Sequence, residues 1–129
     1  MEIACSLFDL SLPVKHTKFL NHYLTNLRKV DSVERVILFG SCARRDFSKE
    51  SDIDLVILGD YISDDDELFI YRGCGPNYTC DFFLSCDIFV FTSKWYDKAK
   101  VIVGSLQHKI ELYGVDLTDI LRNPVKEIV

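Results

Sequence analysis

Four residues suited to phosphate and metal chemistry lie close together in FGSCARRDFSKESDIDLVILG, residues 39–59. The pair Gly40 and Ser41 follows one apolar segment, and the two aspartates Asp52 and Asp54 lead into another. Side chains alternate across a β-strand, so both carboxylates point to the same face. They repel each other unless a cation lies between them, and Mg2+ is commonly held by one or two carboxylates together with substrate phosphates. Alternatively, Asp52 caps a turn and Asp54 is only exposed.

Gly40 and Ser41 lie where a predicted strand ends and a predicted short helix begins. Glycine lets a ligand approach the backbone, and free N–H groups at a helix start favour a phosphate. The Ser41 hydroxyl can add one more hydrogen bond. Because this pair ends one strand and the aspartates begin the next, the two places meet only if the strands are antiparallel. A triphosphate on Gly40 and Ser41 would then reach a metal ion on Asp52 and Asp54.

A third carboxylate is expected beside these two. Asp87 precedes the apolar segment IFVF much as Asp54 precedes LVIL. Neighbouring strands lie about 4.8 Å apart, so Asp87 could stand next to the paired aspartates. Asp81 precedes FFL and is the competing candidate, but the longer strand pattern favours Asp87. Either residue could instead be an ordinary aspartate at a strand end.

The elements that must position these residues are predicted from apolar spacing and from turn and capping residues. Segment 15–30 has the spacing of an amphipathic helix, with His16 and His22 on different faces and expected at its surface or rim. A short helix is predicted at 43–47, and a long one from Thr92–Ser93 to Tyr113. Short apolar runs predict strands, at 33–39, 52–58 and 88–91. The acidic run 59–67 predicts a solvated loop or helix start, with a short helix possible over 68–71.

Two further features concern the later part of the chain. Gly114 is predicted to cap the helix that ends at Tyr113, and a short strand-like segment, VDL, follows it. The segment 72–80, which contains two glycines and a proline, is either a mobile loop over a site or a connector.

Composition narrows the class of protein and its partners. With 129 residues the chain has the length of one domain, and 48% hydrophobic residues suffice for one core. The net charge of −5 and the lack of a basic stripe argue against free nucleic acid as the main partner. No apolar run approaches the ~20 residues of a membrane span. The five cysteines and an N-terminus without signal-peptide features predict a reduced, cytoplasmic protein.

The combined pattern resembles a known family. Gly40-Ser41, ten residues, then Asp52-Ile53-Asp54 is similar to the G-S-x10-D-x-D signature of the polymerase-β-like nucleotidyltransferase superfamily. GSCARR and SDIDLVIL resemble the minimal nucleotidyltransferases of prokaryotes, written G-S-x-A-R-G and S-D-I-D-L, and KIELYGVDL resembles the end of that family. The resemblance runs from about Val33 to Leu117 and is weakest from Asp60 to Ser85.

This resemblance implies a nucleotidyltransferase fold of the α+β class, in which a small mixed β-sheet is flanked by α-helices. It also implies a single nucleotidyltransferase domain over 1–129, with an N-terminal helix at 15–30 and a catalytic core at about 33–117. The implied reaction moves a nucleoside monophosphate, AMP from ATP, onto an acceptor hydroxyl and releases pyrophosphate.

The family pattern also assigns roles to individual residues. Gly40, Ser41 and Arg44 become contacts of the nucleotide, although Arg44 could instead form a surface ion pair with Asp46 or Glu50. Three carboxylates become catalytic ligands of two Mg2+ ions, and the last of them is a possible base: Asp52, Asp54 and Asp87. Arg45 departs from the family, which usually has glycine there; it could crowd the turn or add positive charge near the phosphates.

The family also suggests a partner. Minimal nucleotidyltransferases often accompany small helical proteins of the HEPN class in toxin–antitoxin pairs, where they are thought to act as antitoxins by adenylylating a tyrosine of the toxin. A chain of this length has no second domain to hold an acceptor, so a partner protein or a second copy must supply that pocket. The alternative is a non-catalytic binding module that neutralises or scaffolds a helical partner. Exposed aromatic residues such as Trp95 and Tyr96 could serve such an interface, although core packing is the other use for them.

Overall fold

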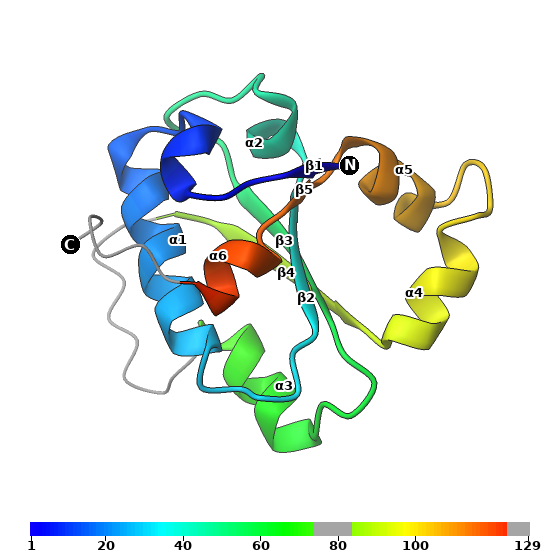
Figure 1. Ribbon diagram of the computed structural model, residues 1–129. Helices are drawn as coiled ribbons and strands as arrows, with labels where there is room; N and C mark the ends of the chain where they lie inside the picture. The colour runs from blue at the N-terminus through cyan, green and yellow to red at the C-terminus, as the bar shows by residue number, and fades with distance from the viewer. Residues whose placement is uncertain (74–83, 124–129) are drawn as a thin grey trace.

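The computed structural model of the protein describes residues 1–73 and 84–123, and the arrangement of this part is seen in Figure 1. Five strands form one sheet in the order β1-β5-β2-β3-β4. Their bounds are Glu2–Ile3 (β1), Arg35–Phe39 (β2), Ile53–Leu58 (β3), Cys86–Phe91 (β4) and Val115–Asp116 (β5). Strand β2 is antiparallel to both of its neighbours, β3 and β5, while β3 with β4 and β1 with β5 are parallel pairs.

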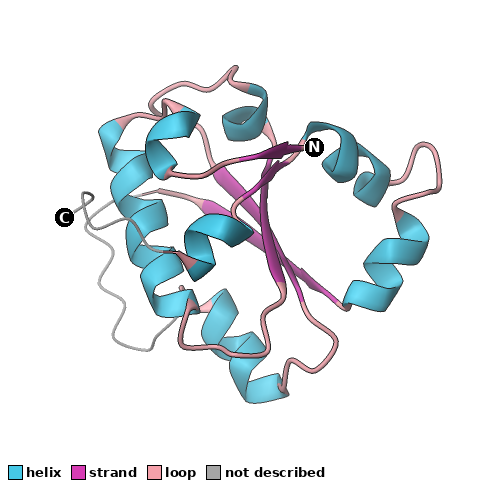
Figure 2. Ribbon diagram, in the orientation of Figure 1, coloured by secondary structure: helices cyan, strands magenta, loops and turns pink. Residues whose placement is uncertain are grey.

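Helices cover both faces of this sheet, as the colouring of Figure 2 shows. They are η1 (Leu7–Leu10, a 3-10 helix), α1 (Val14–Leu27), α2 (Ser41–Arg44), α3 (Asp64–Tyr71), α4 (Ser93–Ala99), α5 (Leu106–Tyr113) and α6 (Thr118–Arg122). In Figure 1, α1 and α6 lie on one side of the sheet, and α4 and α5 lie on the other. The predicted α+β class, with a small mixed sheet flanked by helices, is confirmed.

The two faces of the sheet carry cores of different size. The larger core joins the inward faces of α1, η1 and α6 to alternate residues of the strands, among them Val36, Leu38 and Leu55. The smaller core consists of Ile37, Val56, Leu58, Tyr96 and Ile110, with Phe39 and Phe91 packed against it. Since the residues of a strand alternate between faces, Asp54 shares the face of Val56 and the smaller core. The carboxylate therefore lies on the less thickly covered side.

The segment after β4 differs from the prediction of one continuous helix up to Tyr113. It contains two helices, α4 and α5, separated by residues 100–105. Gly104 has a φ of 93°, a backbone conformation that favours glycine, and the Ser105 hydroxyl caps α5 by accepting from the His108 N–H. Apolar periodicity continues through the break, so the spacing of apolar residues alone did not reveal it.

The other predicted elements are close to those observed. The predicted helix 15–30 corresponds to α1, which ends at Leu27, and the predicted helix at 43–47 is the shorter and earlier α2. The acidic run leads into α3, where the Ser63 hydroxyl accepts from the Asp66 N–H. The carboxylates in the first turn of α3 interact favourably with the positive end of the helix dipole. The two-residue strand β1 and the helix η1 were not predicted from the sequence. No helix in the described ranges has the length and apolarity needed to cross a bilayer.

Gly114 is the C-cap of α5, as predicted, but a left-handed backbone is not the reason why glycine is needed there. Its φ of −73° is open to any residue. A Cβ at this position would instead lie 2.5 Å from the Ile110 carbonyl oxygen and 2.8 Å from Cγ2 of Ile37. Glycine is therefore required because α5 passes closely over β2 on its way into β5.

Candidate active site

The aspartates and the Gly40–Ser41 pair meet at one end of the sheet, as the predicted antiparallel strands require. Phe39, the last residue of β2, pairs with Asp54 near the start of β3. Asp54 in turn pairs with Asp87 of the parallel neighbour β4. Asp87 thus stands beside Asp54, where the third carboxylate was expected. Asp81, the competing candidate, lies outside the described residues.

Mutual repulsion affects the carboxylate of Asp54. Its pKa is raised to about 6, first by burial, then by the negative charge of Asp87, then by that of Asp52, and also by a side-chain hydrogen bond with Asp87. Arg44 lowers the pKa but does not reverse the shift. Asp54 is half-buried, whereas Asp52 and Asp87 are exposed. Asp54 therefore holds a proton more readily than an ordinary aspartate does, and a cation beside it would relieve the repulsion.

Gly40 packs directly against this carboxylate. It has φ 75° and ψ −157°, a backbone region that is essentially restricted to glycine. A Cβ at this position would overlap the Oδ2 atom of Asp54. Gly40 is also the N-cap of α2, whose first residue is Ser41, and its carbonyl accepts from the N–H groups of Ala43 and Arg44. The close approach of backbone and carboxylate is the structural reason for glycine in the motif.

The turn that carries Asp52 is held by two buried side chains. Nε2 of His16 donates to the Ser51 carbonyl oxygen at 2.8 Å, and Sγ of Cys42 donates to the Asp52 carbonyl oxygen at 3.4 Å. The Cys42 thiol has its pKa raised to about 11, mainly by burial and next by the charge of Asp54. The Cys86 thiol, beside Asp87 in sequence, likewise has a pKa raised to about 12, mainly by burial. Neither thiol is a nucleophile at neutral pH.

The prediction that His16 is a surface or rim residue is wrong. His16 is fully buried, and its Nδ1 has no hydrogen-bond partner in the described part of the chain. The spacing of His16 with Leu20, Tyr23 and Leu27 places it on the buried face of α1, so its position could have been found from the sequence. The exposed His22 agrees with the prediction.

We expect His16→Ala to lower the free energy of unfolding by about 2–4 kcal/mol. The variant leaves a cavity under α1 and removes the donor to Ser51, which leaves a part-buried carbonyl without this partner. Urea unfolding followed by circular dichroism measures the change. His22→Ala on the same helix is the matched control and should stay within about 0.5 kcal/mol of the wild type. Equal effects of the two substitutions would contradict the role given to His16.

Arg44 has the ion pair that was considered as the alternative to a nucleotide contact. Its Nε lies 3.4 Å from Oδ2 of Asp46, and both side chains are exposed. Such a pair contributes about 0–1 kcal/mol, so Arg44 can exchange this partner for a phosphate at little cost. The positive charge of Arg44 also lowers the pKa of Asp54. A nucleotide contact for Arg44 stays a prediction.

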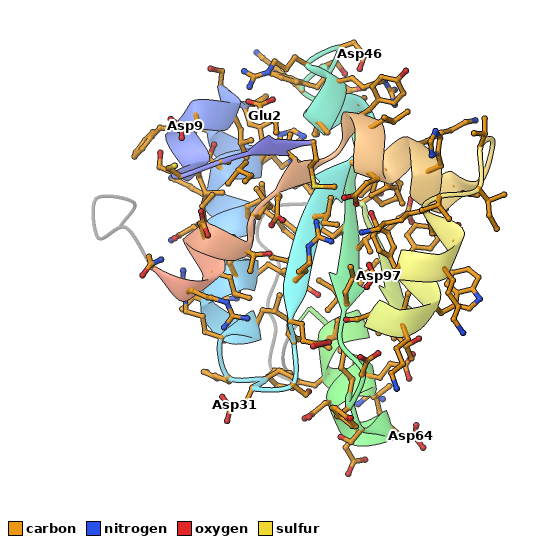
Figure 3. The ribbon with its side chains drawn as sticks, turned by 45° about the vertical axis from the view of Figure 1, so that its right-hand side comes forward. Glu2, Asp9, Asp31, Asp46, Asp64 and Asp97 are labelled. Carbon is orange, nitrogen blue, oxygen red and sulfur yellow. The ribbon has the colours of Figure 1, made fainter. Side chains whose placement is uncertain are left out.

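Arg45 occupies a left-handed backbone position, which explains why glycine is usual in the family pattern at this point. Its φ is 65° and its ψ is 22°, and it is the C-cap of α2. The side chain forms an ion pair with Glu2 at 2.7 Å and donates to the Asp9 carbonyl oxygen at 3.4 Å. Glu2 and Asp9 lie at one corner of the molecule, near the loop that carries Asp46 (Figure 3). Arg45 therefore ties α2 to the N-terminal segment.

We expect Arg45→Gly to be at least as stable as the wild type and Arg45→Ala to be the least stable of the three. Glycine removes about 1 kcal/mol of left-handed strain, which offsets the loss of an exposed ion pair worth about 0–1 kcal/mol. Alanine loses the pair and keeps the strain. Thermal melts of the three proteins test this order. Arg45→Ala melting above Arg45→Gly would show that backbone strain does not govern this position.

The carboxylates fit a divalent cation in their chemistry and only partly in their arrangement. Their oxygens are the hard ligands that Mg2+ prefers, and Asp54 and Asp87 are adjacent and mutually repelled. Within residues 1–73 and 84–123, however, no group of three His, Cys, Asp or Glu side chains is arranged to hold a metal ion. Phosphate oxygens and water would have to complete the coordination, as they commonly do for Mg2+.

Part of the chain is similar in sequence to known nucleotidyltransferases. Residues 21–74 match the family model described as "Polymerase beta, Nucleotidyltransferase". Over 28 residues the chain is 57% identical to a "putative protein adenylyltransferase" of Methanocaldococcus jannaschii; the match covers 22% of this chain and spans only 28% of that relative's length. A solved structure of a "putative nucleotidyltransferase" from Sulfolobus solfataricus is 20% identical and has a TM-score of 0.40, with 67% of this chain and 81% of that chain covered.

The segment matched by the family model contains Gly40, Ser41, Asp52 and Asp54 at their motif spacing. Over this segment the chain is similar to the polymerase-β-like nucleotidyltransferases, in line with the resemblance of its motif.

Proposed function

We propose that the protein is a metal-dependent adenylyltransferase that moves AMP from ATP to a hydroxyl group on a partner protein. One observation carries the proposal: Gly40–Ser41 and the carboxylates of Asp52, Asp54 and Asp87 gather at the same end of the sheet. Phosphates and the metal ions that accompany them need these two kinds of group within a few ångströms of each other.

The residues of this site have distinct roles in the proposed reaction. Gly40 and Ser41 bind the phosphates, and Asp52, Asp54 and Asp87 hold the metal. Bound Mg2+ ions would stabilise charge on the attacking and leaving oxygens. The acceptor oxygen forms a bond to the α-phosphorus while the bond from that phosphorus to pyrophosphate breaks. The hydroxyl proton passes to a carboxylate, and Asp87 suits this task because it is exposed at the edge strand β4.

A helical protein of the HEPN class is the proposed partner, in a toxin–antitoxin pair in which this chain is the antitoxin. The name of the Methanocaldococcus relative, a protein adenylyltransferase, supports a protein as acceptor. Aromatic side chains beside Asp87 also support it: Phe89 and Trp95 are partly exposed, at 37% and 51%, and Phe91 contacts both. Tyr96, considered earlier as an interface residue, is instead buried, with its hydroxyl bonded to Glu111 at 2.7 Å.

The test is transfer of labelled AMP from ATP with Mg2+ to a helical protein of the HEPN class, or to proteins of a lysate. Asp52→Asn and Asp54→Asn should abolish the label on the acceptor, whereas the exposed Asp97→Asn on α4 should not. Tight partner binding that survives the site substitutions, with no transfer by the wild type, would replace the catalytic proposal by the non-catalytic binding module.

A further inference from the structure

The two aspartates of the D-x-D motif are held in place by different means. Asp54 lies within β3, where it pairs with Phe39 of β2 and with Asp87 of β4. Asp52 precedes the first residue of β3, and in the described sheet the pairing of this strand begins at Ile53. Ladder hydrogen bonds therefore fix the backbone of Asp54 but not that of Asp52. Other contacts must set where the Asp52 carboxylate lies.

Two buried side chains bond to the backbone around Asp52. Nε2 of His16 lies 2.8 Å from the Ser51 carbonyl oxygen, and Sγ of Cys42 lies 3.4 Å from the Asp52 carbonyl oxygen. A thiol is a weak donor, so the bond from His16 is the stronger of the two. His16 belongs to α1 and is 35 positions from Ser51 in the chain. It thus ties the N-terminal helix to the turn that carries Asp52.

The turn itself is well connected on both sides of Asp52. The Ser51 hydroxyl oxygen accepts from the Ser48 N–H at 2.8 Å, and the Ser51 N–H donates to the Ser48 carbonyl oxygen at 3.2 Å. After Asp52, the Ile53 N–H donates to the Ser85 carbonyl oxygen at 3.0 Å. A bond that fixes the Ser51 carbonyl therefore fixes the next residue, Asp52, as well.

The environment of His16 indicates that its imidazole serves as a donor and not only as packing. The side chain is fully buried, and its Nδ1 has no hydrogen-bond partner within the described residues. A carbonyl oxygen only accepts, so Nε2 carries the proton in the bond to Ser51, and in the neutral ring Nδ1 is an unpaired acceptor. A buried acceptor without a partner is unfavourable. Leucine would fill the same space without this cost, but it could not bond to Ser51.

We propose that His16 is a positioning residue of the candidate active site: through the Ser51 carbonyl it holds Asp52 beside Asp54 and Asp87. The inference rests on the proposed function, in which these three carboxylates hold the metal. Asp52 and Asp54 lie near each other, since the negative charge of Asp52 raises the pKa of Asp54. A shift of the turn would change the distance between their carboxylates. His16 acts only through the backbone of the turn and lies outside the Gly-Ser and D-x-D motif.

Three substitutions of His16 separate the donor from the packing. The amide Nε2 of glutamine is as many bonds from Cβ as Nε2 of histidine, so His16→Gln keeps a donor for Ser51. The asparagine amide is one bond shorter, and leucine has no donor. Mn2+, used in place of Mg2+, is titrated into the full chain, and the free ion is measured by electron paramagnetic resonance. His16→Leu and His16→Asn should weaken Mn2+ binding about tenfold, and His16→Gln should stay within about threefold of the wild type.

Controls distinguish positioning from a general loss of stability. Leu20→Val alters another buried side chain of α1, one turn after His16. This variant should melt at a lower temperature but bind Mn2+ as the wild type does. Asp52→Asn should weaken Mn2+ binding at least as much as His16→Leu. Circular dichroism checks that each variant is folded at the temperature of the titration, and if His16→Leu is not, the comparison of His16→Gln with His16→Asn decides.

The outcomes distinguish this inference from the catalytic proposal. Mn2+ affinity that follows the predicted pattern, with no AMP transfer to any acceptor, would retain the role of His16 and reject the adenylyltransferase reaction. Wild-type Mn2+ affinity in folded His16→Asn, or an equal loss in His16→Gln, would overturn the role of His16 even if the wild type transfers AMP. A wild type that binds no Mn2+ would reject both the metal site and the positioning role.

Discussion

Replacement of Asp54 by asparagine should abolish nucleotidyl transfer and, at the same time, raise the melting temperature of the metal-free protein. The expected loss of transfer follows from the proposed function, in which Asp54 holds the metal. Metal-assisted stabilisation of the transition state is worth several kcal/mol, so we expect a fall in rate of about 10³-fold or more. The gain in stability follows from the unfavourable environment of the same carboxylate in the folded chain.

The sign of the stability change comes from the raised pKa of Asp54. In the folded protein this pKa is about 6, against an ordinary value of 3.8 for aspartate, with burial as the main cause and the charge of Asp87 next. Between about pH 4 and pH 6 the folded state therefore binds more protons than the unfolded state, and the free energy of unfolding falls as pH rises. Because the side chain is only half-buried, solvent screening reduces the penalty at pH 7.5 to about 1 kcal/mol.

Thermal melts in EDTA at pH 5 and pH 7.5 provide the measurement. At pH 7.5 the Asp54→Asn variant should melt about 4 °C above the wild type, and this advantage should shrink at pH 5. Mg2+ with ATP should stabilise the wild type but not the variant. The exposed Asp97→Asn serves as control, since it removes a charge only from a surface pair with Lys100. A variant that melts below the wild type at pH 7.5 would show that Asp54 and Asp87 do not destabilise each other.

Replacement of Gly40 by alanine should remove activity without removing any chemical group. The new methyl group would overlap Oδ2 of Asp54 and must displace that carboxylate or the backbone. The φ of 75° with ψ of −157° adds strain of about 1–3 kcal/mol for any other residue. We expect transfer to fall about 10²-fold or more, since a displacement near 1 Å in a catalytic site has an effect of this size.

The Gly104→Ala variant separates the effect of backbone strain from the effect of displacing the Asp54 carboxylate. Gly104 also has a positive φ, 93°, but no atom lies within 4 Å of where its Cβ would be. This variant should lose stability by about 1 kcal/mol while it keeps its transfer rate. Rates and melting temperatures of both variants, measured side by side, test the argument. A Gly40→Ala protein with wild-type activity would mean that contact between Gly40 and Asp54 is not needed for the site.

Local sequence was enough to predict the carboxylate end of the site. Alternation along the predicted strand 52–58 puts Asp52 and Asp54 on one face, although β3 itself begins at Ile53. The short link from Gly40 to Asp52 leaves room for little except the antiparallel return that is observed. Arg45 shows where such reasoning stops. Its departure from the family pattern was visible, but the left-handed backbone and the ion pair with Glu2 were not, because Glu2 is 43 positions away in the chain.

The sequence by itself was enough to predict the chemistry proposed for this protein: a phosphate-binding turn, two carboxylates spaced two residues apart, and a third at the start of a later strand. These features depend on spacing within segments of a few residues. Only the tertiary structure decided how far the carboxylates repel each other, that His16 is buried under the Asp52 turn, and that α5 closes a cavity beside Gly40. The reason is physical: strand register, helix placement and desolvation arise from packing between segments far apart in the chain, and apolar periodicity specifies which face is buried but not its neighbour.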